Sequence, residues 1–159
     1  MSFLKRPNDF LFRALVIVAS TSLAVLCLLV IYSVVMRYVF SDAPDYVEPI
    51  ALLLVIVIAM FGAALKVREG GHIGLDSLVK NLSEKGQAIA AGIQHLCLIA
   101  FAAAVFFGCL QMAETTIDDR IPIIGIPEAV RYLIPVVASV CIALFSFEHL
   151  LALFVKKQK

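Results

Sequence analysis

One short polar run holds the residue types best suited to chemistry. The segment KVREGGHIGLDSLV, residues 66–79, places basic residues, glycines, a histidine and an aspartate between two apolar stretches. Such residues in a loop can cradle a phosphate, bind a metal or supply a catalytic base. The phosphate-loop pattern G-x-x-x-x-G-K-[ST] is absent, and His72 with Asp76 supplies too few ligands for a metal site. We therefore predict no catalytic, metal-binding or cofactor-binding residue in this chain, and His72 is expected to be structural.

A pair of histidines in apolar segments is the second candidate for chemistry. His95 lies about two turns from one end of its segment, and His149 about one and a half turns from the corresponding end of the next. In antiparallel helices the two rings could share a depth, as bis-histidine haem ligation requires. The alternative is that His95, Gln94 and Glu148 hydrogen-bond to one another or to backbone, or reach the membrane interface. A single pair of histidines favours this hydrogen-bonded interpretation.

The composition shows which solvent surrounds these residues. Of the 159 residues, 62% are hydrophobic and 16% are charged, with a mean hydropathy of +1.02. Soluble domains are about half apolar and about one-quarter charged. The composition therefore predicts a lipid environment. A formal net charge of +1 argues against electrostatic binding of nucleic acid.

Four apolar segments divide the chain, at about 14–36, 49–65, 88–112 and 132–154. Crossing about 30 Å of hydrocarbon takes about 20 helical residues. Closed barrels need alternating segments, which are absent, so helices are the expected spanning form. The prediction is an all-α integral membrane protein, with residues 1–159 forming a single four-helix domain. Pro135 is expected in the first turn of the fourth helix, where proline is tolerated.

Basic residues predict the orientation of the spans. Ten lie in the N-terminal segment, the loop between spans two and three, and the C-terminal tail, and three lie on the other side. Lysine and arginine are enriched in cytoplasmic loops, so both termini are predicted to be cytoplasmic. Lys66 and Arg68, at the end of span two, are expected to extend toward lipid headgroups.

The polar run also predicts a change of chain direction. Gly70 and Gly71 end the second helix. Apolar residues then recur with helical spacing over about 75–85, on a face formed by Leu75, Leu78, Val79 and Leu82. Such an amphipathic helix is expected to lie in the plane of the membrane surface.

Small residues mark a face for close helix packing. Ala100, Ala104 and Gly108 recur every four residues in span three, and Ala59 and Ala63 do so in span two. Small residues allow helix backbones to approach closely in lipid. This spacing predicts close packing, either within the chain or against a partner.

The ordered motifs resemble a known family of membrane subunits. The run MFGAALKVREGGHIGLDSLVKNL, residues 60–82, resembles the signature of the small membrane subunit of tripartite ATP-independent periplasmic (TRAP) transporters, the DctQ-like family. The family pattern has Gly-Ala-Ala at a helix end, a basic residue, Gly, His-Ile and an amphipathic Asp-x-Leu segment. The matching positions are Gly62, Ala63, Ala64, Arg68, Gly71, His72, Ile73, Asp76 and Leu78.

Two flanking motifs extend the resemblance over most of residues 37–136. MRYVFSDAPDYVEPI resembles the family's exit from span one and acidic entry to span two, at Arg37, Tyr38, Phe40 and Glu48. IPIIGIPEAVRYLIPV resembles its Gly-Ile-Pro turn into span four, at Gly125, Ile126, Pro127, Tyr132 and Pro135. The chain departs from the family in having no tryptophan. Tyr38, Tyr46 and Tyr132 could replace the missing aromatic anchors.

The resemblance implies a scaffold function in the bacterial inner membrane. A small subunit of this family pairs with a large membrane subunit that carries the coupling sodium and the substrate. A periplasmic binding protein delivers an organic acid, such as a C4-dicarboxylate or a sialic acid. The residues expected at a partner or lipid interface are Arg37, Glu48, Gly62, Lys66, Arg68, His72, Asp76, Leu78, Ala100, Ala104, Gly108 and Pro127.

Two other functions remain open from the residues alone. One is a haem-binding membrane anchor for electron transfer that uses His95 and His149. The other is an autonomous small transporter or channel. Transporters that act alone usually carry ionisable groups near the bilayer midplane, and spans one and two hold none there. The scaffold is therefore the favoured interpretation.

Overall fold

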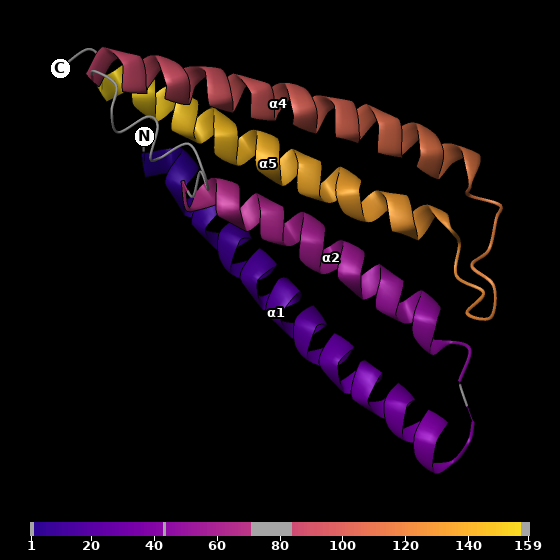
Figure 1. Cartoon of the computed structure of the whole chain (residues 1–159). Coiled ribbons are helices and arrows are strands. Elements are labelled where there is room, and N and C mark those ends of the chain that lie inside the picture. Colours follow the sequence, from indigo (N-terminus) through magenta and orange to yellow (C-terminus); the bar gives the residue numbers. More distant parts are fainter. Residues whose placement is uncertain (1, 43, 71–83, 157–159) are drawn as a thin grey trace.

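The computed structural model describes residues 2–42, 44–70 and 84–156 (Figure 1). It contains four long helices, α1 (Ser2–Val39), α2 (Val47–Arg68), α4 (Glu84–Thr115) and α5 (Ala129–Lys156). Each is long and apolar enough to cross a membrane, and the described ranges contain no strand. The prediction of an all-α membrane protein is therefore confirmed. The predicted in-plane helix lies almost wholly outside the described residues, as do His72, Asp76 and Leu78.

The four helices form an open layer rather than a closed bundle. α4 packs against α5, α5 against α2, and α2 against α1, whereas α1 and α5 meet only briefly. Within the described part of the chain, α4 contacts neither α1 nor α2. The order across the layer is therefore α4–α5–α2–α1 (Figure 1). This arrangement leaves α1 and α4 as the two edges.

α5 is the central helix of the layer. Some 39% of its apolar span is buried inside the protein, against 11% for the span of each other helix. Neighbours on both sides cover it, and the side chains that it buries include Ala138, Ser139, Cys141, Phe145 and Ser146. α5 is therefore the most buried helix of the layer, with α4 packed on one side of it and α2 on the other.

The helices converge at one end and diverge at the other (Figure 1). We call the end where α1 begins and α5 ends the terminal end, and the opposite end the far end. A core links all four helices, with Leu15 from α1, Val67 from α2, Ala102 from α4 and Phe145 from α5. Burial of these apolar side chains holds α2 against α5 and α1 against α2 where the helices converge.

The fourth helix begins earlier than the sequence suggested, which changes the position of its proline. α5 starts at Ala129, so Pro135 lies inside the helix and beyond its first turn. The prediction of a first-turn proline is therefore wrong. An interior proline cannot donate the usual helical hydrogen bond to the carbonyl four residues earlier, which here belongs to Arg131.

A compact loop joins α4 to α5 at the far end. The amide of Ile121 donates to the carbonyl of Ile126 at 2.8 Å, and the amide of Gly125 donates to the carbonyl of Ile121 at 3.0 Å. Gly125 has φ +72°, a left-handed conformation that favours glycine. The guanidinium of Arg120 donates to the Gly125 carbonyl at 2.9 Å. These bonds fold the loop back, and Ile121 is 2% exposed.

Candidate functional site: a polar clamp joining the helices

Arg68, the last residue of α2, lies at the centre of a polar cluster at the terminal end. Its guanidinium forms ion pairs with Glu148 of α5 and with Asp9 of α1. The Arg68 Nη2 to Asp9 Oδ1 distance is 2.5 Å. The Arg68 and Glu148 side chains are 16% and 18% exposed, whereas Asp9 is 62% exposed. Arg68 is therefore held mainly within the protein, between Glu148 and Asp9.

Two further contacts hold Arg68 and Glu148 in place. The side-chain amide of Asn8 donates to Glu148 Oε2 at 2.6 Å, so this carboxylate receives hydrogen bonds from two helices. The Arg68 guanidinium carbon lies 5.6 Å from the centre of the Phe145 ring, within the range of a cation–π contact. We call Asn8, Asp9, Arg68, Glu148 and His149 the polar clamp.

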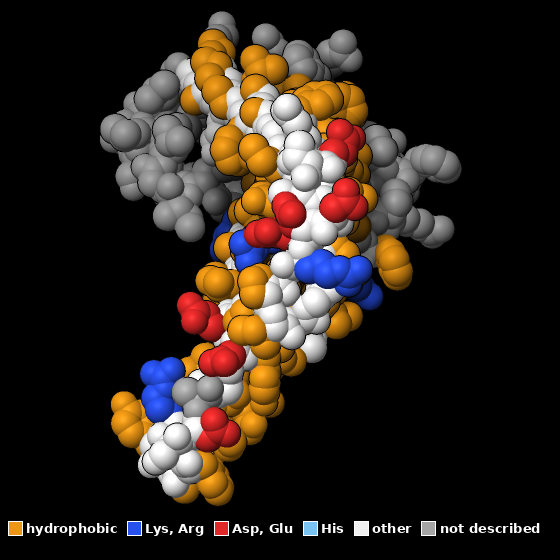
Figure 2. Space-filling view, turned by 90° about the vertical axis from the view of Figure 1, so that its right-hand side faces the viewer, with side chains coloured by type: hydrophobic (Ala, Val, Ile, Leu, Met, Phe, Trp, Pro, Cys, Tyr) orange, Lys and Arg blue, Asp and Glu red, His pale blue; other side chains and the backbone are white. Residues whose placement is uncertain are grey.

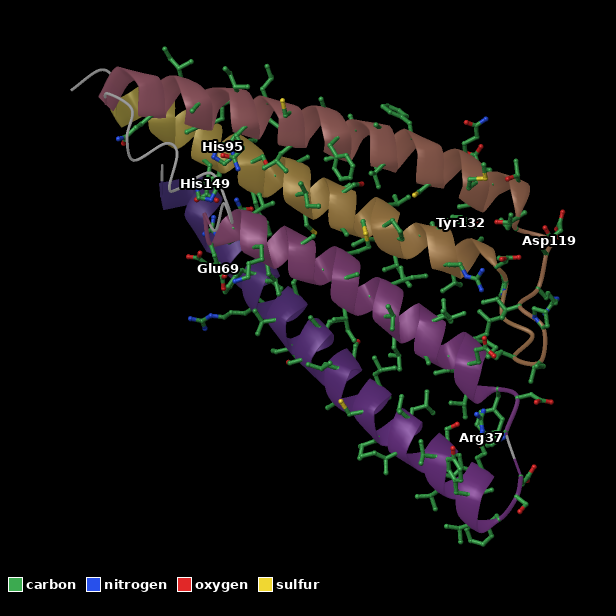
Figure 3. All side chains as sticks on the ribbon, viewed as in Figure 1. Arg37, Glu69, His95, Asp119, Tyr132 and His149 are labelled. Atoms are coloured by element: carbon green, nitrogen blue, oxygen red, sulfur yellow. The ribbon has the colours of Figure 1, made fainter. Side chains whose placement is uncertain are left out.

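The histidines connect the polar clamp to α4. His149 Nε2 lies 3.1 Å from the backbone carbonyl oxygen of Arg68. A carbonyl oxygen only accepts, so Nε2 of His149 carries the donating proton. The His149 ring stacks on the ring of His95 in α4, with centroids 5.2 Å apart and an interplanar angle of 6° (Figure 3). The prediction that these two histidines share a depth and face each other is therefore confirmed.

Their geometry does not fit the haem interpretation. Axial ligation requires the two rings to point nitrogen atoms at one iron from opposite sides of a macrocycle. Here the rings lie flat against each other, and Nε2 of His149 is directed at a backbone carbonyl. His149, which the hydrogen-bonded alternative did not include, bonds to the backbone of α2. Glu148, however, pairs with Arg68 rather than with a histidine.

The polar clamp is suited to holding helices rather than to reacting. Its central carboxylate and guanidinium neutralise each other, and both are largely buried. Removing one partner of such a pair costs about 3–5 kcal/mol, because the other charge remains buried without compensation. The exposed Asp9 contributes less, since solvent screens its charge. The clamp therefore fixes α1 and α2 against α5, and the histidine stack adds α4.

The other predicted residues of span two lie outside the clamp. Lys66 is exposed and pairs with Glu69 at 2.8 Å on the surface. Gly62 lies within α2, and a Cβ atom added there would meet nothing within 4 Å. Close contact among the described helices therefore does not explain the glycine.

The predicted small-residue face of α4 is exposed along its whole length. Ala100, Ala104 and Gly108 are all exposed, whereas Ala102 and Ala113 on the opposite side of α4 are buried. Ala59 and Ala63 of α2 are also exposed. We call Ala100, Ala104 and Gly108 the small-residue edge, because α4 forms an edge of the layer. This face is therefore available to a partner or to lipid.

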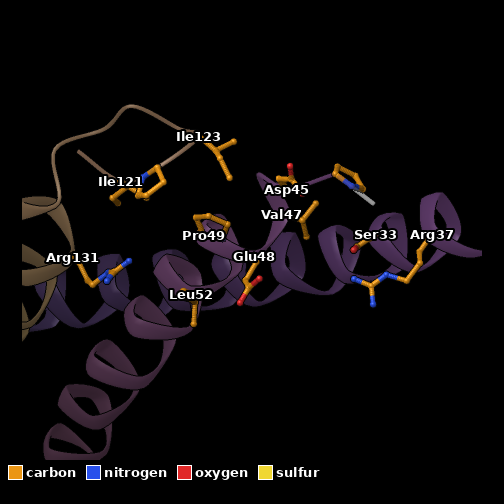
Figure 4. Close-up of a pocket in the computed structure, with 12 residues that line it drawn as sticks. Ser33, Arg37, Asp45, Val47, Glu48, Pro49, Leu52, Ile121, Ile123 and Arg131 are labelled. Atoms are coloured by element: carbon orange, nitrogen blue, oxygen red, sulfur yellow. The ribbon is translucent and has the colours of Figure 1, made fainter. Parts of the chain in front are cut away.

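The remaining predicted interface residues lie at the far end. Figure 2 looks at this end and shows acidic and basic side chains gathered there, with hydrophobic side chains along the flanks. Arg37 of α1 and Glu48 of α2 line one cavity (Figure 4). Pro127 is exposed in the α4–α5 loop, where it forms an isolated bridge with Arg120. Arg68 and Arg37 thus belong to sites at opposite ends of the layer.

The sequence interpretation missed Asn8 as a partner of Glu148 and Asp9 as a partner of Arg68. Both precede the predicted first span, but α1 begins at Ser2 and carries them into the polar clamp. The sequence did contain one indication that a polar partner was needed. Glu148 is an acidic residue inside an apolar segment, and a buried carboxylate requires a cation or hydrogen-bond donors.

Comparison with known proteins identifies the family of this chain. The family described as tripartite ATP-independent periplasmic transporters, DctQ component, matches residues 26–156. A protein of Haemophilus influenzae is 28% identical over 143 residues, covering 90% of this chain and 89% of the relative. A second protein of that organism is 24% identical over 131 residues, covering 82% and 79%. Both are named as TRAP transporter small permease proteins. The chain therefore belongs to the DctQ family, as a multi-pass inner-membrane component of a TRAP transporter and not an enzyme.

Proposed function

We propose that this chain is the scaffold subunit of a sodium-coupled TRAP transporter. In this proposal the large membrane subunit carries both the coupling sodium and the substrate. The substrate is an organic acid of the C4-dicarboxylate or sialic acid class, delivered by a periplasmic binding protein. The small subunit stabilises the large one and keeps part of the transporter static while another part moves.

The polar clamp is the observation that supports this role most strongly. Its ion pairs and hydrogen bonds join α1, α2 and α5 at one end of the layer, and the histidine stack connects α4 to α5. Breaking a largely buried ion pair is unfavourable. Movement of these helices past one another would break such contacts. A layer held in this way suits a static platform.

The small-residue edge is the surface that we assign to the large subunit. Ala100, Ala104 and Gly108 lie exposed in a row at the edge of the layer. Membrane helices associate through small residues because their backbones can then approach closely. Ala102, on the other side of the same helix, already packs inside the chain. Each side of α4 would thus have its own neighbour.

The orientation follows the basic residues. We propose that the terminal end faces the cytoplasm and the far end the periplasm, in accord with the enrichment of lysine and arginine in cytoplasmic segments. The α4–α5 loop, with Arg120 and Pro127, would then face the binding protein.

Reconstitution into liposomes tests the scaffold function. The large subunit and the binding protein are reconstituted with and without this chain, and uptake of labelled organic acids is measured with an inward sodium gradient. We expect uptake only when all three proteins are present, with no uptake by this chain alone. Full uptake without this chain would contradict the proposal. Uptake that is independent of sodium would contradict the coupling but not the scaffold role.

A further inference from the structure

A cavity of about 550 Å³ opens at the far end of the molecule. Its walls come from the end of α1, the beginning of α2, the α4–α5 loop and the beginning of α5 (Figure 4). Pockets of about 300–1,000 Å³ are typical of sites for small molecules. The cavity exists because α1 and α2 diverge toward this end while the folded loop keeps Ile121 beside them.

Charged side chains of both signs face this cavity without neutralising one another. Arg37, Asp45 and Glu48 line it, and none of the three forms an ion pair with another described residue. Arg131 also lines it, but its guanidinium is paired with Glu128 at 3.0 Å. The cavity therefore presents one uncompensated guanidinium and two uncompensated carboxylates. An occupant that carries an anionic and a cationic group would match them.

Aromatic residues indicate the depth of the cavity in the membrane. The hydroxyl groups of Tyr32 and Tyr46 lie 3.0 Å apart across the gap between α1 and the beginning of α2. Tyr38, beside Arg37, is 79% exposed. Tyrosine is enriched where hydrocarbon meets the headgroup region. The charged rim of the cavity therefore lies at the level of lipid headgroups.

The lining becomes less polar along the helices toward the membrane interior. Ser33 lies one helical turn inward from Arg37, and Leu52 lies one turn inward from Glu48. Leu52 is 49% exposed, as a side chain beside an acyl chain would be. A soluble organic ion would contact the charged side chains but not the less polar lining around Leu52. A phospholipid would use both.

We propose that this cavity binds the headgroup of a zwitterionic phospholipid with a primary ammonium group, phosphatidylethanolamine. The phosphate accepts hydrogen bonds from Arg37, and the ammonium donates to Glu48 and Asp45. One acyl chain descends past Ser33 and Leu52 between the diverging ends of α1 and α2. The two carboxylates exceed the single unpaired guanidinium, which disfavours a lipid with net negative charge. This site goes beyond the scaffold function and does not depend on the substrate that the transporter carries.

Lipid binding to the full chain provides the first test. The purified protein in detergent is titrated separately with dioleoyl phosphatidylethanolamine, phosphatidylcholine and phosphatidylglycerol, and native mass spectrometry counts the bound lipids. We expect one phosphatidylethanolamine to bind most tightly. Phosphatidylcholine lacks N–H donors, and phosphatidylglycerol lacks the cation. Equal affinity for all three lipids, or a preference for phosphatidylglycerol, would overturn the proposal.

Variants separate the cavity from general surface binding. Glu48→Gln and Arg37→Gln each remove one charge-assisted hydrogen bond, so affinity for phosphatidylethanolamine should fall about tenfold or more. Arg37→Lys retains a cation and should restore much of the binding. Glu114→Gln changes an exposed carboxylate of α4 that does not line the cavity, and it should bind like the wild type. Loss of affinity in Glu114→Gln equal to that in Glu48→Gln would refute the assigned site.

Photo-crosslinking in the assembled transporter distinguishes a lipid from a protein occupant. A photoreactive residue replaces Ser33, and the complex is illuminated in liposomes that contain phosphatidylethanolamine. Mass spectrometry then shows whether phosphatidylethanolamine is attached to the crosslinked protein. We expect a lipid adduct that decreases in the Glu48→Gln background. A crosslink to the large subunit or the binding protein, without a lipid adduct, would show that a protein fills the cavity and would overturn the proposal.

Discussion

Arg68 at the end of α2 pairs with Glu148 of α5, a residue 80 positions away in the sequence. The pair lies where the four helices converge, and both side chains are largely buried. Each charge is therefore compensated mainly by the other, with Asn8 and Asp9 as additional partners. This relationship leads to the first prediction.

Removal of either charge should destabilise the protein severely. Arg68→Leu and Glu148→Leu should each lower the free energy of unfolding by about 3–5 kcal/mol, because the remaining charge is left buried. The double variant should lower the free energy of unfolding by less than the sum of the two single effects, because it removes both the Arg68 and the Glu148 charge and leaves neither buried alone. Thermal unfolding of the detergent-purified protein measures all three variants.

A surface ion pair provides the control for this experiment. Lys66→Gln breaks a pair whose side chains are 61% and 49% exposed, and it should cost at most about 1 kcal/mol. If Lys66→Gln and Arg68→Leu lowered the free energy of unfolding equally, burial of the polar clamp would contribute nothing to stability.

The histidine stack should contribute less than the ion pair. His149→Phe retains an aromatic ring against His95 but cannot donate to the Arg68 carbonyl, so it should cost about 1 kcal/mol. His149→Ala removes both contacts and should cost more. Thermal unfolding and yield of the purified protein give the comparison. If the phenylalanine variant unfolds at the same temperature as the alanine variant, the stack is unimportant.

The two sides of α4 should respond differently to the same substitution. Ala104→Leu changes an exposed residue of the small-residue edge, so the stability of the isolated chain should change by no more than about 0.5 kcal/mol. Its complex with the large subunit should be recovered in much lower yield. Co-purification through a tag on the large subunit measures this yield.

Ala102→Leu is the matched control on the buried side of the same helix. Ala102 is 2% exposed, and overpacking there should destabilise the isolated chain by about 1–3 kcal/mol. Normal co-purification of the Ala104→Leu variant would place the partner on another face.

Residues 71–83 lie outside the described residues, and their role is predicted from the sequence. Leu78→Asp removes a large aliphatic side chain whose full burial contributes about 1.5–3 kcal/mol, so it should impair assembly and transport. Lys80→Gln on the polar face should cost about 1 kcal/mol at most. His72→Gln should retain substantial transport. Loss of transport in His72→Gln, with the complex assembled at normal yield, would identify a functional histidine.

The topology makes a separate prediction. Asp119 lies in the far-end loop (Figure 3), whereas α1 begins and α5 ends at the terminal end. Reporter fusions after Lys159 and within the loop at Asp119 should therefore report opposite sides of the membrane, with the C-terminus in the cytoplasm. A periplasmic reporter at the C-terminus would reverse the proposed orientation.

The sequence alone indicated that the chain lies in lipid, that its fold is all-α and that it is related to the DctQ family. Long uncharged segments can cross a bilayer only as helices or closed barrels, because buried backbone groups must bond to one another. The ordered motifs around Arg37, His72 and Pro127 indicated the family, and the match over residues 26–156 agrees with them. These conclusions depend on local composition and order, which the sequence displays directly.

Only the tertiary structure decided which faces of the helices pack together. Lipid and protein interior are both apolar, so hydropathy does not distinguish a face that meets lipid from one that meets another helix. The sequence could therefore not show that Ala102 is buried and Ala104 exposed. It could not show that Arg68 turns inward to Glu148 either, because pairing between residues distant in the sequence depends on how the helices converge.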